Sequence, residues 1–501
     1  MESLSSLGAG FANALSPENL LFALLGCLIG TVLGLLPGIG ATAGIAILIP
    51  LTYSLDATTA IIMLAAIFYG TAYGGTITSV LLNLPGESES AITCLDGYPM
   101  TLRGRAGVAL TMAGIGSFVG GTLATIGLVL AAQPLATLGL KIGPPEFFAL
   151  VLVGIALLVG LVGKSLVTGL ISAVLGLLIA MVGIDPVAGM PRFTFGAAHL
   201  LDGINFVPVL VGLFGLGELL HKAGGAGPRP AAPTLRQLLP TRTDLRRSTP
   251  AIGRGAFIGF FIGLIPGVTN AISSLMSYST EKKVSKFRHE LGQGAVEGVS
   301  GPETANNAHA NASLVPMFTL GIPASPAIAV LMGAFLANGL TPGPRLFVEE
   351  PLLVWTVIAS LFIGNAILLI LNVPLVGLWT RILAVPYSVL CAILFAFLVI
   401  GSYAVSSSIL DVLIMIFFGV VGLVMRRLSV PLEPLVLTMI LGPLLEGALR
   451  QSLQISQGSF AIFFERPIAL VFLILAAGII AASISGTGSK KRKKLAQTIA
   501  S

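Results

Sequence analysis

Charged residues are scarce in this sequence. They make up 10 % of its 501 residues, whereas 55 % are hydrophobic and the mean hydropathy is +0.99. A soluble domain carries about 25 % charged residues, so a soluble enzyme or binding module is excluded. Apolar stretches close to the roughly 20 residues that cross a bilayer recur along the chain. The sequence therefore predicts an all-α polytopic membrane protein with about 11–12 transmembrane helices.

Residues that hold metals or carry out catalysis are few as well. The three cysteines, Cys27, Cys94 and Cys391, are scattered without the spacing of a metal site or a disulfide framework. The four histidines contain no pair at metal-ligand spacing. We find no convincing Ser-Lys, Ser-His, paired-Asp or His-Glu arrangement and no Walker motif. These absences argue against an enzyme, and we expect no cofactor.

Glycine and proline are abundant, with 61 and 30 residues, and they form an internal repeat. The pattern Gly-x-x-x-Gly-x-x-Pro-Gly at 30–38 returns 229 residues later, at 259–267. Leu-Asn-Leu-Pro-Gly at 82–86 has a looser echo in Leu-Gly-Ile-Pro-Ala at 320–324. Internal repeats of this length are typical of transporters. The predicted parts are a first membrane repeat at 1–221, a basic cytoplasmic linker at 222–254, a second membrane repeat at 255–450, an extra transmembrane helix at 451–489 and a basic cytoplasmic tail at 490–501.

Basic residues predict the orientation of the repeats, because cytoplasmic segments are enriched in Lys and Arg. Arg254 and Lys282 flank the second Pro-Gly segment, which is typical of a re-entrant hairpin, although two short spans also fit. The first Pro-Gly segment has no basic flank, so we expect it to enter from the periplasm. Counting spans from there, with single spans expected among others at 58–84, 204–221, 312–338 and 352–373, makes the repeats inverted. We expect the chain to lie in a bacterial inner membrane. The basic segments are expected to contact lipid headgroups and not nucleic acid.

Polar residues inside hydrocarbon are costly, so polar clusters around a broken helix are candidate sites. A Pro-Gly break frees carbonyls, which suit a cation such as Na⁺, and exposes NH groups, which suit a carboxylate. The candidate substrate- or ion-binding residues of the first half are Pro37, Gly38, Thr42, Tyr73, Gly75, Thr76, Ser79, Asn83, Pro85, Gly86 and Asp96. Those of the second half are Pro266, Gly267, Asn270, Glu303, Asn306, Asn307, Asn311, Gly321 and Pro323, with Glu303 as the candidate acid.

Other interpretations of these residues stay open. A Gly-x-x-x-Gly pattern is also typical of a helix-packing face. The three asparagines between 306 and 311 are equally suited to knit helices together by hydrogen bonds. Glu87, Glu89 and Asp96 fit a solvated loop at the membrane edge. His309 is the one histidine for which we do not favour a plain solvated or packing role.

Several motifs, in order, resemble one family. They are Gly34-Leu35-Leu36-Pro37-Gly38-Ile39-Gly40, Tyr73-Gly74-Gly75-Thr76, Leu84-Pro85-Gly86-Glu87, Asp96-Gly97-Tyr98-Pro99 and Pro302-Glu303-Thr304-Ala305-Asn306-Asn307. Over roughly residues 15–485 the chain is similar to TctA, the large membrane subunit of the bacterial tripartite tricarboxylate transporters. The resemblance adds Gly40 to the candidate residues. One departure is Val-Thr-Asn at 268–270, where the family usually has a further glycine, so contacts near Asn270 are expected to differ.

The resemblance implies a three-part uptake system. Its other parts are a small four-helix, TctB-like membrane subunit and a periplasmic, TctC-like binding protein that delivers a carboxylate, such as citrate or a related di- or monocarboxylate. Transport in the family is secondary, driven by an ion gradient, so we expect Na⁺ or H⁺ as the coupling ion. The two Pro-Gly breaks and the two Leu-x-x-Pro breaks are expected to meet near the bilayer midplane. The alternatives are a stand-alone organic-anion exporter or channel and, less consistent with the residues, an intramembrane enzyme.

Overall fold

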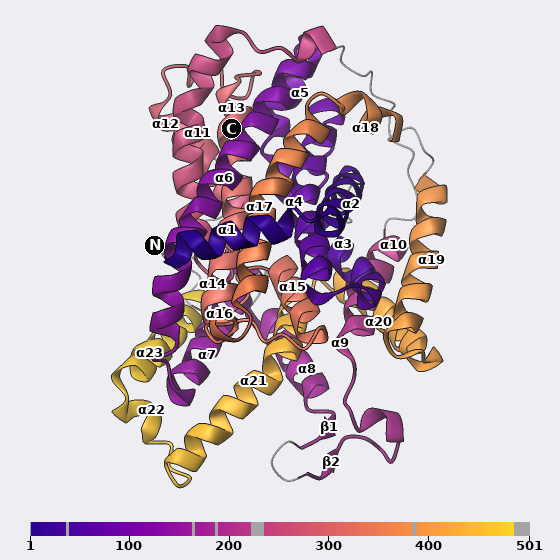
Figure 1. The fold of residues 1–501 in the computed structure, drawn as a ribbon, viewed down its shortest axis with the longest axis vertical. Coiled ribbons are helices and arrows are strands. Elements are labelled where there is room, and N and C mark those ends of the chain that lie inside the picture. The colour runs from indigo at the N-terminus through magenta and orange to yellow at the C-terminus, as the bar shows by residue number, and fades with distance from the viewer. Residues whose placement is uncertain are drawn as a thin grey trace. The chain divides into compact units, whose positions relative to one another are not determined.

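The computed structural model describes residues 2–36, 40–162, 166–185, 189–221, 235–382 and 387–484. Helices dominate these residues, and their only strands form one short antiparallel pair (Figure 1). Within the described ranges, five helices are long and apolar enough to cross a membrane. They are α2 (Pro17–Leu35), α4 (Ala57–Leu82), α6 (Ala106–Gly139), α17 (Pro351–Asn372) and α20 (Ile409–Arg427). Seven shorter apolar helices accompany them. The predicted fold class, an all-α polytopic membrane protein, is confirmed.

The chain forms two compact units, and each contains segments from both halves of the sequence. The first unit comprises Met1–Thr137, Val207–Ile265 and Thr269–Leu423. Besides the five long helices, it holds α1 (Glu2–Ala14), α3 (Gly40–Leu48), α5 (Cys94–Leu102), α9 (Phe206–Leu210), α10 (Gly217–His221), α11 (Arg242–Gly263), α12 (Asn270–Val284), α13 (Glu297–Ala312), α14 (Leu314–Leu320), α15 (Pro326–Ala337), α16 (Leu346–Glu349), α18 (Val376–Ile382) and α19 (Tyr387–Ser406). Short 3₁₀ or π turns join some of them: η1 (Ile49–Ser54), η2 (Ser88–Ala91), η4 (Val211–Leu216) and η5 (Leu235–Leu238).

The second unit comprises Leu138–Phe206, Pro266–Val268 and Val424–Ser501. Its elements are α7 (Pro144–Val162), α8 (Leu166–Ala180), β1 (Gly183–Ile184), β2 (Pro191–Arg192), η3 (Ala198–Leu200), α21 (Glu433–Ile455), α22 (Ile462–Glu465) and α23 (Pro467–Ile484). α21 packs on α7 and α8, and α23 packs on α7. Asp185 and Glu446 form ion pairs with Arg192 and Arg450, which ties the β1–β2 hairpin to α21.

Most expected spans coincide with helices, but one does not. The span expected at 312–338 is two helices, α14 and α15, because the chain turns at Gly321 in a left-handed conformation with φ +69°. The span expected at 204–221 is a continuous helical stretch, in which the π-helical turn η4 joins α9 to α10. Extra helical turns of the π type commonly mark functional positions. The short helices α1 and α5 were not expected at all.

Part of the expected linker is helical. Residues 222–234 and the basic tail lie outside the described residues, whereas α11 begins at Arg242, because Thr241 and Asp244 form a capping box. Asp244 also pairs with Arg105 at 2.6 Å. Burial by itself would raise the pKa of Asp244, but the hydrogen bonds from Arg105 and Thr241 outweigh this and hold it below its usual range. The start of α11 is therefore anchored next to the start of α6.

The internal repeat is visible in the first unit as two matching glycine stripes. The stripes are Gly26, Gly30 and Gly34 on α2, and Gly255, Gly259 and Gly263 on α11. α2 packs closely on α4 through its stripe, since a Cβ at Gly30 would lie 2.7 Å from the Ile67 carbonyl oxygen. α11 packs on α13 in the same way, and a Cβ at Gly263 would lie 2.7 Å from the His309 carbonyl oxygen. The packing interpretation of the Gly-x-x-x-Gly pattern is thus confirmed.

The looser repeat, at 82–86 and 320–324, has similar backbone conformations in its two copies. Asn83 ends α4 with φ +54°, and Gly321 ends α14 with φ +69°, so both helices close with a left-handed residue two positions before a proline. Pro85 and Pro323 then carry the chain away from the helix axis. Each half of the sequence therefore contributes a glycine-faced helix, a break, a second helix and then a helical segment with a left-handed end, which is α4 in the first half and α13 followed by α14 in the second. The inverted orientation of the two halves stays a prediction.

Candidate functional site

Glu303 lies in the middle of α13 with 1 % of its surface exposed. Its Oε2 accepts a hydrogen bond of 2.7 Å from Thr76 Oγ1 on α4, and its Oε1 accepts a short hydrogen bond from Thr93 Oγ1, directly before α5. No basic side chain among the described residues faces this carboxylate. A buried carboxylate without a cationic partner is costly. The arrangement suits a group that takes up a proton or a small cation.

Asn306 lies one helical turn after Glu303 and connects it to α12. Asn270, the first residue of α12, donates a hydrogen bond of 3.2 Å from Nδ2 to Asn306 Oδ1, and both side chains are buried. The Asn306 amide group faces the Glu303 carboxylate, but its Nδ2 has no hydrogen-bond partner of ordinary geometry within the described ranges. An unpartnered amide donor in the protein interior needs an acceptor. The Glu303 carboxylate, after a small shift, or a carboxylate oxygen of a bound solute would satisfy it.

The next asparagines of α13 bind neighbouring helices instead. Asn307 Nδ2 donates to Ser117 Oγ on α6 at 2.7 Å, and Asn311 Nδ2 donates to the Gly121 carbonyl oxygen at 3.0 Å. On α4, the Tyr73 hydroxyl donates to Asn365 Oδ1 on α17 at 2.7 Å. These contacts favour the knitting interpretation for Asn307 and Asn311, and they show that Tyr73 links α4 to α17.

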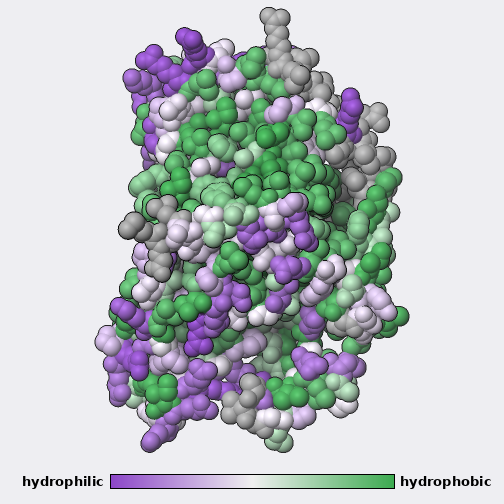
Figure 2. Space-filling view, in the orientation of Figure 1, coloured by the Kyte–Doolittle hydropathy of each residue, from purple (hydrophilic) through white to green (hydrophobic). Residues whose placement is uncertain are grey.

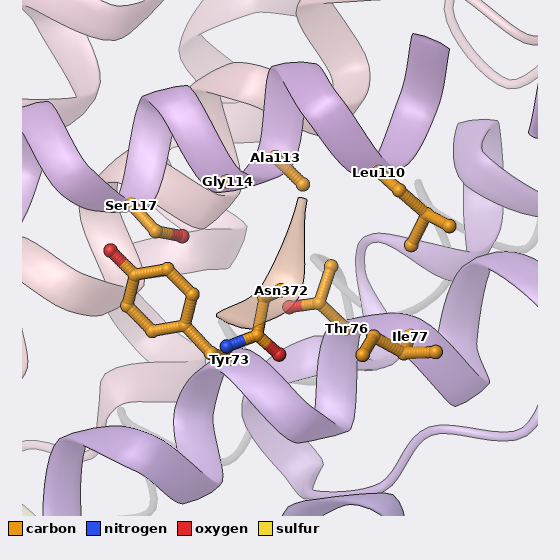
Figure 3. A pocket seen from close by; sticks show the side chains of 8 residues that line it. All are labelled: Tyr73, Thr76, Ile77, Leu110, Ala113, Gly114, Ser117 and Asn372. Carbon is orange, nitrogen blue, oxygen red and sulfur yellow. The ribbon is translucent and has the colours of Figure 1, made fainter. Parts of the chain in front are cut away.

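A small pocket lies beside Thr76, one of the two hydroxyl donors to Glu303. It is lined by Tyr73, Thr76, Ile77, Leu110, Ala113, Gly114, Ser117 and Asn372. Figure 3 shows the Thr76 and Asn372 side chains on one side of the pocket and Ala113 with Gly114 on the opposite side. The volume of about 10 Å³ corresponds to about one water molecule, so an organic carboxylate does not fit in this conformation. Helices must therefore move before such a solute can reach Glu303 from this side.

Asp96 has a different environment. It is completely buried, so the solvated-loop interpretation is wrong for this residue. Its carboxylate accepts hydrogen bonds from the Tyr278 hydroxyl and from the backbone NH groups of Gly292, Gly294 and Ala295, at distances between 2.7 and 3.0 Å. These donors belong to α12 and to the loop that leads into α13. Asp96 therefore fastens that loop to α5, and its use as a ligand stays a prediction.

We expect Asp96→Asn to loosen this loop. The amide keeps one acceptor oxygen and loses the other, so buried NH groups lose their partner, at a cost of about 1–3 kcal/mol. Limited proteolysis at the exposed lysines and arginines of residues 282–290 should become several times faster than in the unmodified protein. Unchanged cleavage would contradict this role for Asp96. Asp56→Asn is the matched control, because Asp56 is exposed and caps only α4.

The first-half candidates are not all brought together. Asn83 and Pro85 are exposed, while Gly86 is buried, and a Cβ there would lie 2.5 Å from Gly75 Cα. Ser79 Oγ donates to the Gly75 carbonyl oxygen of its own helix at 2.9 Å. These contacts pack the Leu-Pro-Gly turn on α4.

The residues around the two Pro-Gly breaks are only partly described. Pro37 and Gly38 lie outside the described residues. Gly40 begins α3 with φ +60°, and a Cβ there would lie 3.6 Å from Glu87 Oε1, while Thr42 is half-buried. In the second break, Gly267 turns the chain with φ +82° after Pro266. Sodium sites at the breaks therefore stay predictions.

Sequence reasoning missed several polar partners in the first unit. Thr93 donates a hydrogen bond to Glu303, Ser117 accepts one from Asn307, and Asn365 accepts one from the Tyr73 hydroxyl. Ser117 and Asn365 were detectable, because each is a polar residue in an otherwise apolar helix. Thr93 follows an already polar loop and carried no such signal.

Comparisons with known proteins relate the whole chain to one family. The model of the tripartite tricarboxylate transporter TctA family matches residues 20–437. The chain is 43 % identical over 496 residues, covering 99 % of both chains, to an Agrobacterium vitis protein described as an uncharacterized 52.8 kDa protein in the TAR-I ttuC′ 3′ region. It is 45 % identical over 215 residues to a second Agrobacterium vitis protein, from the TAR-II ttuC′ 3′ region, which covers 43 % of this chain and 89 % of that one. No solved structure matches the chain.

Proposed function

The chain belongs to the tripartite tricarboxylate transporter TctA family, and we propose that it is the membrane carrier subunit of a secondary, ion-gradient-driven uptake system for carboxylates. Its partners would be the small TctB-like membrane subunit and a TctC-like periplasmic binding protein that delivers the solute. It would work in a bacterial inner membrane, with the linker and the C terminus in the cytoplasm. It would not act as an enzyme.

One observation carries this proposal: the buried carboxylate of Glu303 accepts its hydrogen bonds from hydroxyl groups. These donors, Thr76 and Thr93, come from the first half of the chain, whereas Glu303 itself belongs to the second half. A proton or Na⁺ that binds here would neutralise the carboxylate and remove the cost of burying its charge where the two halves meet. Binding of the ion would then favour one arrangement of the helices over another, which is the basis of coupled transport.

The solute carboxylate is proposed to bind next to this ion. Asn306 Nδ2 offers an unpartnered donor, and the first turn of α12, which begins at Asn270, offers backbone NH groups directly after the Pro-Gly turn. A cation on Glu303 would attract the same anion. Ion and solute would therefore bind more tightly together than alone.

We expect Asn306→Ala to lower carboxylate uptake by about 10–100-fold, because a hydrogen bond to a charged group contributes about 1.5–3 kcal/mol. The measurement is the initial uptake rate of labelled citrate, succinate and lactate in cells with intact partner subunits. Asn338→Ala is the matched control, since Asn338 only binds the Ala334 carbonyl oxygen of its own helix. Undiminished uptake by the Asn306 variant would count against the site. Uptake that does not need the binding protein would favour a stand-alone channel or exporter.

A further inference from the structure

α12 is a short helix whose buried face is polar. Its buried residues are Asn270, Ser273, Ser274, Ser277, Tyr278 and Glu281. Its counterpart after the first break, α3, buries only alanine, glycine, isoleucine and leucine. Both helices pack against the long helix that follows them, α4 or α13. The fold therefore does not require polar residues at this position, and the polar face of α12 needs another explanation.

The polar side chains of α12 form a continuous seam with α13. At its inner end Asn270 contacts Asn306. Further along, Ser273 Oγ and His309 Nδ1 are hydrogen-bonded at 2.7 Å, and Ser274 Oγ donates to the Pro302 carbonyl oxygen at 3.3 Å. From Asn270 to Glu281 the seam runs for about 16 Å along the helix axis.

The middle of the seam holds an unsatisfied hydroxyl group. Ser277 is completely buried, and its Oγ has no hydrogen-bond partner in the part of the chain that the structure describes. It faces Gly301, where a Cβ would lie 3.2 Å from this oxygen. Ser300, the neighbour of Gly301, is also completely buried with an unpartnered Oγ. Buried hydroxyls of this kind are normally satisfied by water or an ion.

The outer end of the seam is closed by an ion pair. Glu281 is completely buried and accepts two hydrogen bonds from Arg254, at 2.7 Å and 2.6 Å, while 36 % of the Arg254 side chain is exposed. Exposed charged residues follow directly, among them Lys282, Lys283 and Lys286. Figure 2 shows hydrophilic atoms gathered over this end of α11 and α12, beside the hydrophobic surface. The seam thus leads from a hydrophilic surface towards the helix that carries Glu303.

We propose that this seam between α12 and α13 is the path by which the coupling cation, a proton or Na⁺, travels between the surface and Glu303. This inference rests on the proposed function. Serine hydroxyls can pass a proton, because a hydroxyl both donates and accepts hydrogen bonds, and hydroxyl and amide oxygens can replace part of the water shell of Na⁺. Opening of the Arg254–Glu281 ion pair would admit the ion. The apolar α3 of the first half offers no such route.

The test separates ion movement from solute binding. In proteoliposomes with the partner subunits, net uptake requires the ion to leave its site in every cycle. Exchange of labelled against unlabelled solute does not, since the ion can stay bound. Ser277→Ala, which removes the hydroxyl without adding volume, is expected to slow net uptake at least about threefold, and Ser277→Leu at least about tenfold. The rate of solute exchange by Ser277→Ala should stay within about twofold of the rate of the unmodified protein.

Ser279→Ala and Ser279→Leu are the matched controls, because Ser279 lies on the same helix, outside the seam, and is only half-buried. Sodium and pH gradients are imposed separately, so that the gradient affected by the Ser277 variants identifies the ion. Net uptake that stays normal in Ser277→Ala overturns the path, and so does an equal loss of exchange and net uptake in that variant. If the unmodified protein shows exchange but neither gradient drives uptake, the proposed function itself fails, and the path fails with it.

Discussion

Glu303→Gln is expected to lower ion-driven carboxylate uptake by at least about 100-fold, because loss of the charge at an ion site costs about 3 kcal/mol or more. Glutamine has nearly the same shape, and its amide oxygen can still accept from Thr76 or Thr93, so the protein should reach the membrane in normal amounts. The measurement is the initial uptake rate per amount of protein in membranes. Near-normal ion-driven uptake would exclude Glu303 as the coupling site.

The same variant distinguishes the two candidate ions. Glutamine resembles a protonated glutamate, so a proton-coupled carrier should keep solute exchange while it loses net uptake. Sodium needs the negative charge, so a sodium-coupled carrier should lose both activities. Thr93→Ser is the control, because it keeps the hydroxyl that Glu303 accepts from and should transport normally. Thr93→Val removes that donor, so its uptake rate is expected to lie between the rates of Glu303→Gln and Thr93→Ser.

Gly259→Ala is expected to destabilise the first unit by about 1–3 kcal/mol, because the added methyl group would overlap the Ala305 carbonyl oxygen of α13. The two helices would have to separate, and the contacts of α13 with α12 would be lost with them. The measurement is the fraction of monodisperse protein that remains after heating in detergent.

Gly253→Ala is the control on the same helix. No atom lies within 4 Å of a Cβ at Gly253, so alanine is expected to be neutral or to stabilise α11 by about 0.5–1 kcal/mol. If both variants lose stability equally, the effect comes from the helix itself and not from close packing. If neither does, the glycine stripe is not needed for the approach of α11 to α13.

Much of the fold was accessible from sequence, and the reason is physical. Apolar length identified α4 and α17 almost to the residue, since a bilayer sets the length of a spanning helix. The Gly-x-x-x-Gly repeat marked the helices that pack most closely, but only two glycines of each stripe of three were recognised. Gly26 and Gly255 have the same spacing of four and the same offset of 229, and that periodicity was the available signal.

The breaks within helices were harder to place. Gly321 and Pro323 were recognised as a break, yet the segment around them was still expected to be one span. Whether a Pro or Gly interrupts a transmembrane helix depends on whether neighbouring groups satisfy the freed backbone, which is a tertiary property. The same limit applies to α11, whose first turn depends on Asp244 and its ion pair with Arg105.

The sequence by itself determined that this chain is a membrane-embedded bundle with duplicated, interrupted helices and a carboxylate at 303, because hydropathy, Gly-Pro spacing and residue type are local properties. Only the tertiary structure decided which polar residues meet. It placed Thr76 and Thr93 on Glu303, enclosed Asp96 in a loop, turned Asn307 and Asn311 towards α6, and aligned the serines of α12 with α13. These outcomes depend on the rotation and approach of helices far apart in the sequence, which close packing sets and no local pattern encodes.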